Sequence, residues 1–450
     1  MEFDNKSVLV IGMARSGIGA AEKLKELGAD VSVVDKQSSA ELQIRSSALK
    51  KKGIKSELGP HCISDLAHKD LVIPSPGVPS GNQLIVEAKK REIPVWSEIE
   101  LAYRLTDCPI VGITGTNGKT TTTMLVGEIF SQADKKGIIA GNIGFPLIKA
   151  IEHGECDMLI AELSSFQLEN IVDFRPFISV LLNITEDHLD WHPDFADYVK
   201  AKRRLFLNQT ENDFAVINWD DPIVREFAGD IRAHVIPFSK HRSLNEGVFI
   251  DKGKIIAAIG KRREICALKE LRIRGEHNYD NSMAAIAVSL IADIPVSDIR
   301  KTLGEFRGIS HRMEFVATVN GVDYFNDSKA TNPDATAKAL RAFKPPIVLL
   351  AGGRNKGNNL RHLVLDIEKK VKAVILFGEA AAEIYPLFEG FNIKAIRVDS
   401  VPEAVAKAKS FCQSGDVVLF SPACASFDQF SNYEERGLVF KDAVMNLSKN

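Results

Sequence analysis

The chain has few cysteines and no long hydrophobic run. Its 450 residues include six cysteines, which are scattered and form no CxxC pair. This spacing argues against a disulfide scaffold or a structural zinc site, and it favours a reduced cytoplasmic compartment. Apolar runs such as Ile347–Ala351 and Val417–Phe420 are far shorter than the roughly 20 residues of a membrane-spanning helix. We therefore expect no membrane partner.

An excess of one charge is also lacking. Lys and Arg number 57, and Asp and Glu number 59, so the net charge is -2. This balance argues against nucleic-acid or membrane-surface binding but allows local basic pockets for anionic small molecules. The first residues, Met1–Lys6, hold acids rather than a basic n-region, so we expect no signal peptide.

Short apolar runs alternate with segments of helical period along most of the chain. The alternation predicts α/β layers with mostly parallel sheets, because crossover helices cover both faces of a parallel sheet. The expected strands are Ser7–Ile11, Val31–Val34, Leu71–Ile73, Ile110–Ile113, Met158–Ala161, Ser179–Asn183, Ile347–Ala351, Val374–Phe377 and Val417–Phe420.

The length suggests about three domains at roughly 100–200 residues each. We place them at 1–96, 97–308 and 309–450, with a hinge at Gly308–Ser310. The mixed stretch Asn212–Arg274 predicts an antiparallel addition to the middle domain.

The most specific motif is TGTNGKT at residues 114–120, between an expected strand and an expected helix. This context predicts a P-loop, in which backbone N–H groups hold phosphates. Lys119 would neutralise phosphate oxygens and the Thr120 hydroxyl would meet Mg²⁺. The usual first glycine of the pattern falls on Ile113, so a plain glycine turn is the alternative.

A second glycine loop, Gly12–Gly19, follows the first strand, and Asp35 ends the next one. The arrangement is similar to a dinucleotide fingerprint. Tight strand–helix packing without a ligand is the alternative. A third loop, Pro74–Val78, follows another strand, and together the two loops favour an anion site.

Acidic and amide side chains also follow strands. Glu162 ends one strand, and His188 lies in NITEDHLD at residues 183–190. Carboxylates beside a P-loop suit a hard cation, whereas His188 is either a ligand or a hydrogen-bonding residue. Asn281, in GEHNYDN at 275–281, would face a nucleotide base.

Four polar loops in the last block predict a second face for an anionic substrate. Their sequences are HR at 311–312, NDSKATNP at 326–333, GGRNKG at 352–357 and SPACASFD at 421–428.

Taken in order along nearly the whole chain, these motifs resemble the Mur ligase family of ATP-dependent amide-bond-forming enzymes. ELSSFQLE at 162–169 together with SPACASFDQF at 421–430 is similar to the members that add D-glutamate to UDP-N-acetylmuramoyl-L-alanine in peptidoglycan synthesis. The resemblance implies a Rossmann-like UDP-binding domain, a central P-loop ATPase and a Rossmann-like amino-acid-binding domain. It also implies a cytoplasmic, monomeric enzyme that forms an acyl phosphate.

The resemblance assigns roles to individual residues. Lys119, His188 and Lys202 would be catalytic. ATP would be held by Gly115, Thr116, Asn117, Gly118, Lys119, Thr120, Thr121, Asn281, Arg312 and Asp327. The ligands of two Mg²⁺ ions would be Thr120, Glu162, His188 and a carbamylated Lys202. The two other substrates would be held by Arg15, Ser16, Asp35, Lys36, Ser75, Gly77, Asn142, Thr331, Lys356, Ser426 and Phe427.

Two segments depart from the family pattern. Asp35-Lys36-Gln37 lacks an arginine expected near the uracil, and Gly353-Arg354-Asn355-Lys356 lacks an acid expected there. The rival interpretations are another Mur ligase, a folylpolyglutamate synthase-like enzyme, a nicotinamide-dependent dehydrogenase and a regulatory P-loop module.

Overall fold

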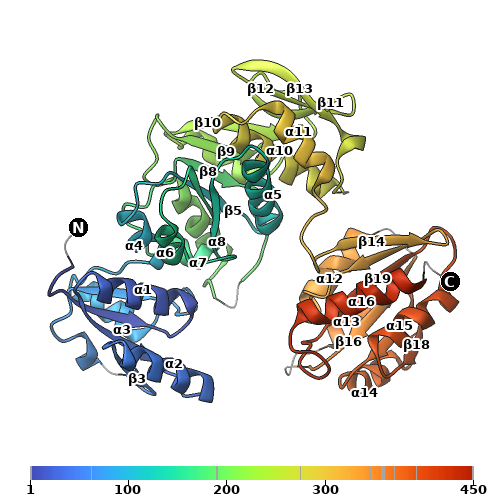
Figure 1. The fold of residues 1–450 in the computed structure, drawn as a ribbon, viewed down its shortest axis with the longest axis horizontal. Coiled ribbons are helices and arrows are strands. Elements are labelled where there is room, and N and C mark those ends of the chain that lie inside the picture. The colour runs from blue at the N-terminus through green and yellow to red at the C-terminus, as the bar shows by residue number, and fades with distance from the viewer. Residues whose placement is uncertain are drawn as a thin grey trace. The chain divides into compact units, whose positions relative to one another are not determined.

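Strands and helices alternate along the chain and build three sheets (Figure 1). The computed structural model describes residues 3–61, 63–188, 191–273, 275–343, 346–355, 360–368, 370–391 and 393–447. All nine expected strands overlap observed strands. The chain separates into two compact units, Met1–Phe306 and Arg307–Asn450, and the first contains two of the sheets. Within the described residues, no helix is long and apolar enough to cross a bilayer.

The first sheet has four parallel strands in the order β3-β2-β1-β4. Small residues of α1 (Ala20 and Ala21) pack closely on this sheet with Leu24. The strand order reverses between β1 and β4, and such a reversal opens a crevice at the carboxyl ends of the strands. The elements are β1 Ser7–Ile11, α1 Arg15–Glu26, β2 Asp30–Asp35, α2 Ala40–Lys51, β3 Lys55–Leu58, β4 Leu71–Pro74, α3 Gln83–Lys90 and α4 Glu98–Arg104.

The second sheet has nine strands in the order β13-β12-β11-β10-β9-β8-β5-β7-β6. Its strands are β5 Ile110–Thr114, β6 Gly137–Gly141, β7 Met158–Glu162, β8 Ile178–Leu181, β9 Phe214–Asn218, β10 His234–Ser239, β11 Gly247–Asp251, β12 Lys254–Ile259 and β13 Lys261–Ala267. Its helices are α5 Lys119–Gln132, α6 Leu147–Ala150, α7 Ser165–Leu168, α8 Phe195–Arg203, α9 Pro222–Glu226, α10 Glu276–Ile291 and α11 Val296–Glu305. Helices α5 and α10 pack against each other in one large core.

The antiparallel addition predicted for Asn212–Arg274 is smaller than expected. β9 and β10 pair in parallel and continue the sheet beyond β8. Only the pairs β11–β12 and β12–β13 are antiparallel. The tight turns at Gly253 and Gly260, both with positive φ, permit these two hairpins.

The third sheet forms the second unit and has the order β14-β15-β19-β16-β17-β18. Only β14 is antiparallel to its neighbour. The elements are β14 Glu314–Val319, β15 Val322–Asn326, α12 Pro333–Ala342, β16 Ile347–Gly352, α13 Arg361–Glu368, β17 Val371–Phe377, α14 Ala381–Ile384, β18 Lys394–Arg397, α15 Val401–Ala408, β19 Val417–Ala423 and α16 Tyr433–Leu447. The carboxyl ends of β15, β19 and β16 therefore lie side by side.

A buried carboxyl group joins helices α4 and α6 in the first unit. Glu98, at the start of α4, accepts a 2.6 Å hydrogen bond from the backbone N–H of Ile148 in α6. Its other oxygen is buried and has no hydrogen-bond partner among the described residues. Burial raises the pKa of Glu98 to about 7, against the hydrogen bonds from the backbone of α6, which lower it.

This raised pKa predicts a pH-dependent stability. Between pH 4.5 and 7 the folded chain binds a proton at Glu98 that the unfolded chain releases, so this stability is present at low pH and is lost above pH 7. The ionised group would cost roughly 3 kcal/mol at high pH. Glu98→Gln should therefore raise the unfolding temperature relative to wild type at pH 8 and much less at pH 5, measured by calorimetry. Exposed Glu57→Gln is the control, and an equal gain at both pH values for Glu98→Gln would contradict the prediction.

Candidate active site

The loop between β5 and α5 has the geometry of a phosphate cradle. The first-turn N–H groups of α5 face the loop, because the helix begins directly after it. Gly115 and Gly118 have φ values of +155° and +86°, which other residue types rarely adopt. Lys119 Nζ donates hydrogen bonds to the carbonyl oxygens of Gly115 (2.7 Å) and Thr116 (2.9 Å). The ammonium charge is thus held over the loop.

Asn281, in the second turn of α10, lies directly against this loop. A Cβ atom on Gly118, whose φ is +86°, would stand 2.2 Å from Asn281 Oδ1, so another residue there would be strained and would displace Asn281. The same oxygen accepts a 3.3 Å hydrogen bond from Thr122 Oγ1. Asn281 and the glycine loop are far apart in sequence, and the fold brings them into one site.

Glu162, the last residue of β7, lies beside the loop as a buried carboxylate. Oε1 accepts a 2.8 Å hydrogen bond from Asn142 Nδ2, which follows β6. Oε2 is buried and has no hydrogen-bond partner among the described residues. A buried oxygen of this kind requires a donor or a cation, and carboxylate and hydroxyl oxygens are the ligands that Mg²⁺ prefers. The second carboxylate oxygen of Glu162 therefore fits the role of a magnesium ligand.

Lys202 is buried although its neighbours form a basic run. It lies in α8, and 1% of it is exposed, whereas Lys200 and Arg203 are exposed. Its Nζ donates a 3.0 Å hydrogen bond to the Gly115 carbonyl and lies 4.6 Å from the ring centre of Tyr198. Burial and the nearby charge of Lys119 lower the pKa of Lys202 well below its ordinary value, while Asp187 opposes this shift.

His188 follows β8 and lies at the surface of the same edge. Its side chain is 47% exposed and its backbone has φ +55°. Its ring meets the edge of Phe166 at a centroid distance of 4.9 Å. This position is compatible with either alternative that the sequence leaves open, metal ligation or hydrogen bonding. The next residues, 189–190, lie outside the described residues.

His192 belongs to the site region, although no motif singles it out. Its Nε2 lies 3.0 Å from Ser165 Oγ, and its Nδ1 lies 2.8 Å from Asp197 Oδ2 and 3.7 Å from Glu169 Oε1. The ring stacks on Phe166 at an interplanar angle of 17°. This buried histidine ties the segment after Glu162 to helix α8. Its only signal in the sequence is a second histidine four positions after His188.

The two glycine loops of the first sheet meet at its strand-order reversal. Ser75 Oγ donates a 2.9 Å hydrogen bond to the Gly12 carbonyl. The Asp35 carboxylate accepts a 2.9 Å hydrogen bond from the backbone N–H of Met13, so it holds the loop itself. Arg45, which no motif indicates, donates a 2.7 Å hydrogen bond to the Met13 carbonyl and brings a cation to this edge.

The remaining predicted contacts of this edge are exposed or half-buried. Arg15 donates a 2.5 Å hydrogen bond to the Gly144 carbonyl of the second sheet's domain. Of the other residues predicted to contact the UDP-linked substrate, Ser16 is half-buried, and Lys36 and Gly77 are exposed.

In the second unit, predicted residues follow the carboxyl ends of neighbouring strands. Asp327 is buried after β15, and burial raises its pKa to about 7, although hydrogen bonds from Ser421 Oγ and the Met313 N–H lower it. Ser426 is buried, and Phe427 is 55% exposed. Thr331 is half-buried and Arg312 is exposed. Lys356 lies outside the described residues.

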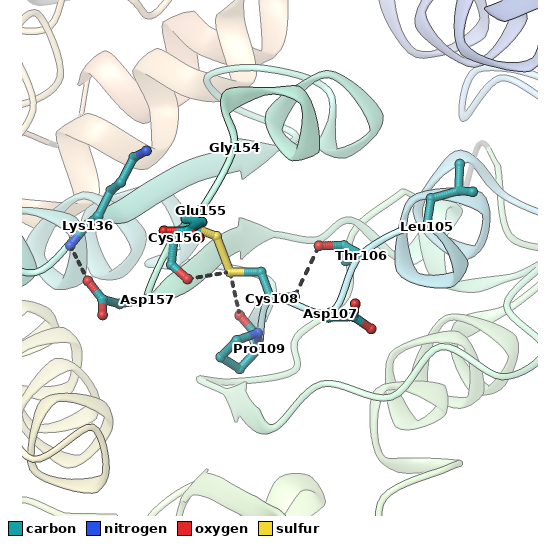
Figure 2. Close-up of a pocket in the computed structure, with 10 residues that line it drawn as sticks. All are labelled: Leu105, Thr106, Asp107, Cys108, Pro109, Lys136, Gly154, Glu155, Cys156 and Asp157. Carbon is teal, nitrogen blue, oxygen red and sulfur yellow. Dashed lines mark hydrogen bonds between the residues drawn. A yellow bond between two sulfur atoms is a disulfide. The ribbon is translucent and has the colours of Figure 1, made fainter. Parts of the chain in front are cut away.

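The opposite edge of the second sheet corrects one expectation. Cys108 and Cys156 form a disulfide, with their Cα atoms 6.2 Å apart, whereas the scattered cysteine spacing argues against a disulfide scaffold and favours a reduced compartment (Figure 2). Each cysteine lies just before one of the paired strands β5 and β7, so strand pairing brings the two together. They line a cavity of about 730 Å³ with Lys136, Asp157 and their neighbours. This cavity lies at the amino ends of the strands, away from the glycine loop.

Three family models match successive parts of the chain. The Mur ligase MurD-like N-terminal domain matches residues 6–97, the Mur ligase middle domain matches 113–289, and the Mur ligase glutamate ligase domain matches 311–424. Among solved structures, UDP-N-acetylmuramate-alanine ligase MurC from Thermotoga maritima has a similar fold. Its TM-score is 0.54 at 20% identity, with 98% of this chain and 99% of that chain covered.

Curated relatives match over the full length. The UDP-N-acetylmuramoylalanine--D-glutamate ligase of Pelotomaculum thermopropionicum is 44% identical, covering 100% of this chain and 99% of the relative. The enzyme of the same name from Geotalea uraniireducens is 45% identical, covering 99% of both. With a phosphate cradle, a buried carboxylate and a buried lysine at one sheet edge, and with this identity along its whole length, the chain belongs to the Mur ligase family.

Proposed function

We propose that the chain is an ATP-dependent ligase that joins D-glutamate to UDP-N-acetylmuramoyl-L-alanine, a cytoplasmic step of peptidoglycan synthesis. The observation that carries the proposal is the full-length identity of 44–45% to relatives that bear this activity in their names. The geometry supports it, because the edge that holds Lys119 also holds Glu162 and Lys202. We further propose that the enzyme acts as a monomer.

Each of the three domains would supply most of the contacts of one substrate, and Arg312 and Asp327 of the third domain would also contact ATP. We propose 1–96 for the UDP end, 97–308 for ATP and 309–450 for D-glutamate. ATP would contact Gly115, Thr116, Asn117, Gly118, Lys119, Thr120, Thr121, Asn281, Arg312 and Asp327. The muramoyl substrate would contact Arg15, Ser16, Asp35, Lys36, Ser75, Gly77 and Asn142. D-Glutamate would contact Thr331, Lys356, Ser426 and Phe427.

The first chemical step would activate a carboxylate, which is a poor acyl donor. The terminal carboxylate of the muramoyl substrate would attack the γ-phosphorus of ATP and release ADP, giving an acyl phosphate. Such a transfer depends mainly on positioning and on stabilised negative charge. Lys119 and the N–H groups at the start of α5 supply positive potential at this point.

Thr120, Glu162, His188 and a carbamylated Lys202 would hold two Mg²⁺ ions. When bound, these ions neutralise phosphate charge. Asn142, which bonds to Glu162, would orient that carboxylate. In the second step the amine of D-glutamate would attack the acyl phosphate, and the tetrahedral intermediate would expel inorganic phosphate.

The substrate pair gives the direct test of this proposal. Purified protein with ATP and Mg²⁺ should release phosphate only when UDP-N-acetylmuramoyl-L-alanine and D-glutamate are both present. L-Glutamate and other amino acids should support little release, and mass spectrometry should detect the amide product. Equal release with another amino acid would assign the chain to a different Mur ligase activity.

Lys119 should be essential for ATP turnover. Lys119→Ala removes the ammonium held over the phosphate cradle, and we expect phosphate release to fall roughly 10²–10⁴-fold, as for other key electrostatic contacts. Lys200→Ala, on an exposed face of α8, serves as the control. Circular dichroism would verify folding, and near-wild-type release by folded Lys119→Ala would refute the P-loop assignment.

Carbamylation of Lys202 has a physical basis in its surroundings. A free lysine titrates near pH 10.4, but burial and Lys119 favour the neutral amine here. A neutral amine adds CO₂ and releases one proton, which gives an anionic carbamate. That anion would be attracted by Lys119 and would offer the oxygen ligands that Mg²⁺ prefers.

The carbamate can be observed without an activity assay. In ¹³C-bicarbonate, wild type should show a carbamate carbon resonance that Lys202→Arg lacks and that Lys200→Arg retains. Lys202→Ala should be nearly inactive, and acetate should restore part of its rate by replacing the lost anion. Normal activity of Lys202→Arg, or no carbamate signal in wild type, would contradict this assignment.

A further inference from the structure

Three loops of the second unit converge on one buried guanidinium. The loops follow β15, β16 and β19, and they contain the residues proposed to contact D-glutamate. Arg436 extends from the first turn of α16 and is fully buried. It belongs to none of the sequence motifs, and the proposed ligand contacts do not include it.

Each nitrogen of the Arg436 guanidinium donates a hydrogen bond to these loops. Nε and Nη2 donate to Ser328 Oγ (3.1 Å) and to the Ser328 carbonyl (2.8 Å), in the loop after β15. Nη1 donates to the Cys424 carbonyl (2.9 Å), in the loop after β19. A single planar group therefore fixes two loops that are about a hundred residues apart in sequence.

The third loop packs on the same guanidinium through a glycine. Gly353, after β16, has φ +123°, and a Cβ atom there would stand 2.9 Å from Arg436 Nη1. It would also stand 2.2 Å from the Ala425 carbonyl. Arg354 and Ala425 then exchange backbone hydrogen bonds of 2.8 and 3.0 Å. Gly353 and Arg354, directly after β16, are thus held against the loop that contains Ser426.

The bonds to Arg436 are charge-assisted, because the group stays ionised at neutral pH. Burial lowers its pKa to about 10, and the charge of Asp428 opposes that shift. The Asp428 carboxylate accepts a hydrogen bond from the Glu379 N–H. Among the described residues, the guanidinium donates to two carbonyls and one hydroxyl, so its charge is directed at the loops themselves.

We propose that Arg436 is the positioning residue of the amino-acid site, and that its guanidinium sets the three loops in the arrangement that binds D-glutamate. The inference rests on the proposed function for the identity of the amino acid. Without Arg436, the loops would sample several arrangements, and binding would have to order them. The apparent affinity for the amino acid would then fall in proportion to the fraction of competent molecules.

Steady-state kinetics of the full chain test this role. Arg436→Met should raise the KM for D-glutamate about tenfold or more, while the KM for UDP-N-acetylmuramoyl-L-alanine changes less than about twofold. The KM for ATP should rise less than that for D-glutamate, because Asp327, proposed to contact ATP, is next to Ser328. Arg436→Lys keeps the charge and should restore part of the affinity. Added guanidinium ion at millimolar concentration should lower the D-glutamate KM of Arg436→Ala and leave wild type unchanged.

Lys370→Met is the matched control in the same unit. Lys370 Nζ also donates to two backbone carbonyls, Leu340 and Phe343, both at 3.1 Å, but it precedes β17 at the opposite edge of the sheet. Its substitution should leave the D-glutamate KM unchanged. If Arg436→Met does not fold, Arg436→Lys provides the test. Its KM for D-glutamate should then rise more than its KM values for the other two substrates.

An unchanged D-glutamate KM in a folded Arg436 variant would overturn the proposal. An equal rise in all three KM values, or the same rise in Lys370→Met, would also overturn it. The wild-type chain separates this result from the proposed function. If wild type releases no phosphate with D-glutamate but does so with another amino acid, the proposed function fails. The same KM comparison with that amino acid then tests Arg436.

Discussion

The parallel pairing of β5 with β7 on one side and β8 on the other is the constraint on which the first unit depends. Parallel strands end at the same sheet edge, so the residues that follow these three strands meet there. The glycine loop follows β5, Glu162 ends β7, and the segment with His188 follows β8. The same pairing, at the opposite edge, brings Cys108 and Cys156 together.

Buried ionisable groups lie at the same sheet edge as the glycine loop. Burying an ionisable group is costly unless it gains a partner or changes its protonation state. Glu162 keeps one unpartnered oxygen among the described residues, and Lys202 has a strongly lowered pKa beside Lys119. These two features complement each other if a cation and a carbamate enter the site. In contrast, His192 holds neighbouring segments through hydrogen bonds at both ring nitrogens.

The second unit uses the same sheet-edge principle with a different anchor. The loops that follow β15, β16 and β19 all contact the buried guanidinium of Arg436. Asp327 accepts hydrogen bonds from Ser421 Oγ and the Met313 N–H, and burial raises its pKa to about 7. The two units thus each present one polar edge, built on a rigid parallel sheet.

The sequence by itself determined the α/β alternation, the positions of nine strands and the glycine loop at 114–120, because these depend on local pattern and on turn geometry. The burial of Lys202 could not be predicted from its basic run, and only the family resemblance pointed to it. The parallel pairing of β9 and β10, the disulfide of Cys108 and the clamp of Arg436 were decided by the tertiary structure alone. Each of these features depends on which distant segments become neighbours in the fold. The order of the strands in the sheets decides which segments meet, and local composition does not.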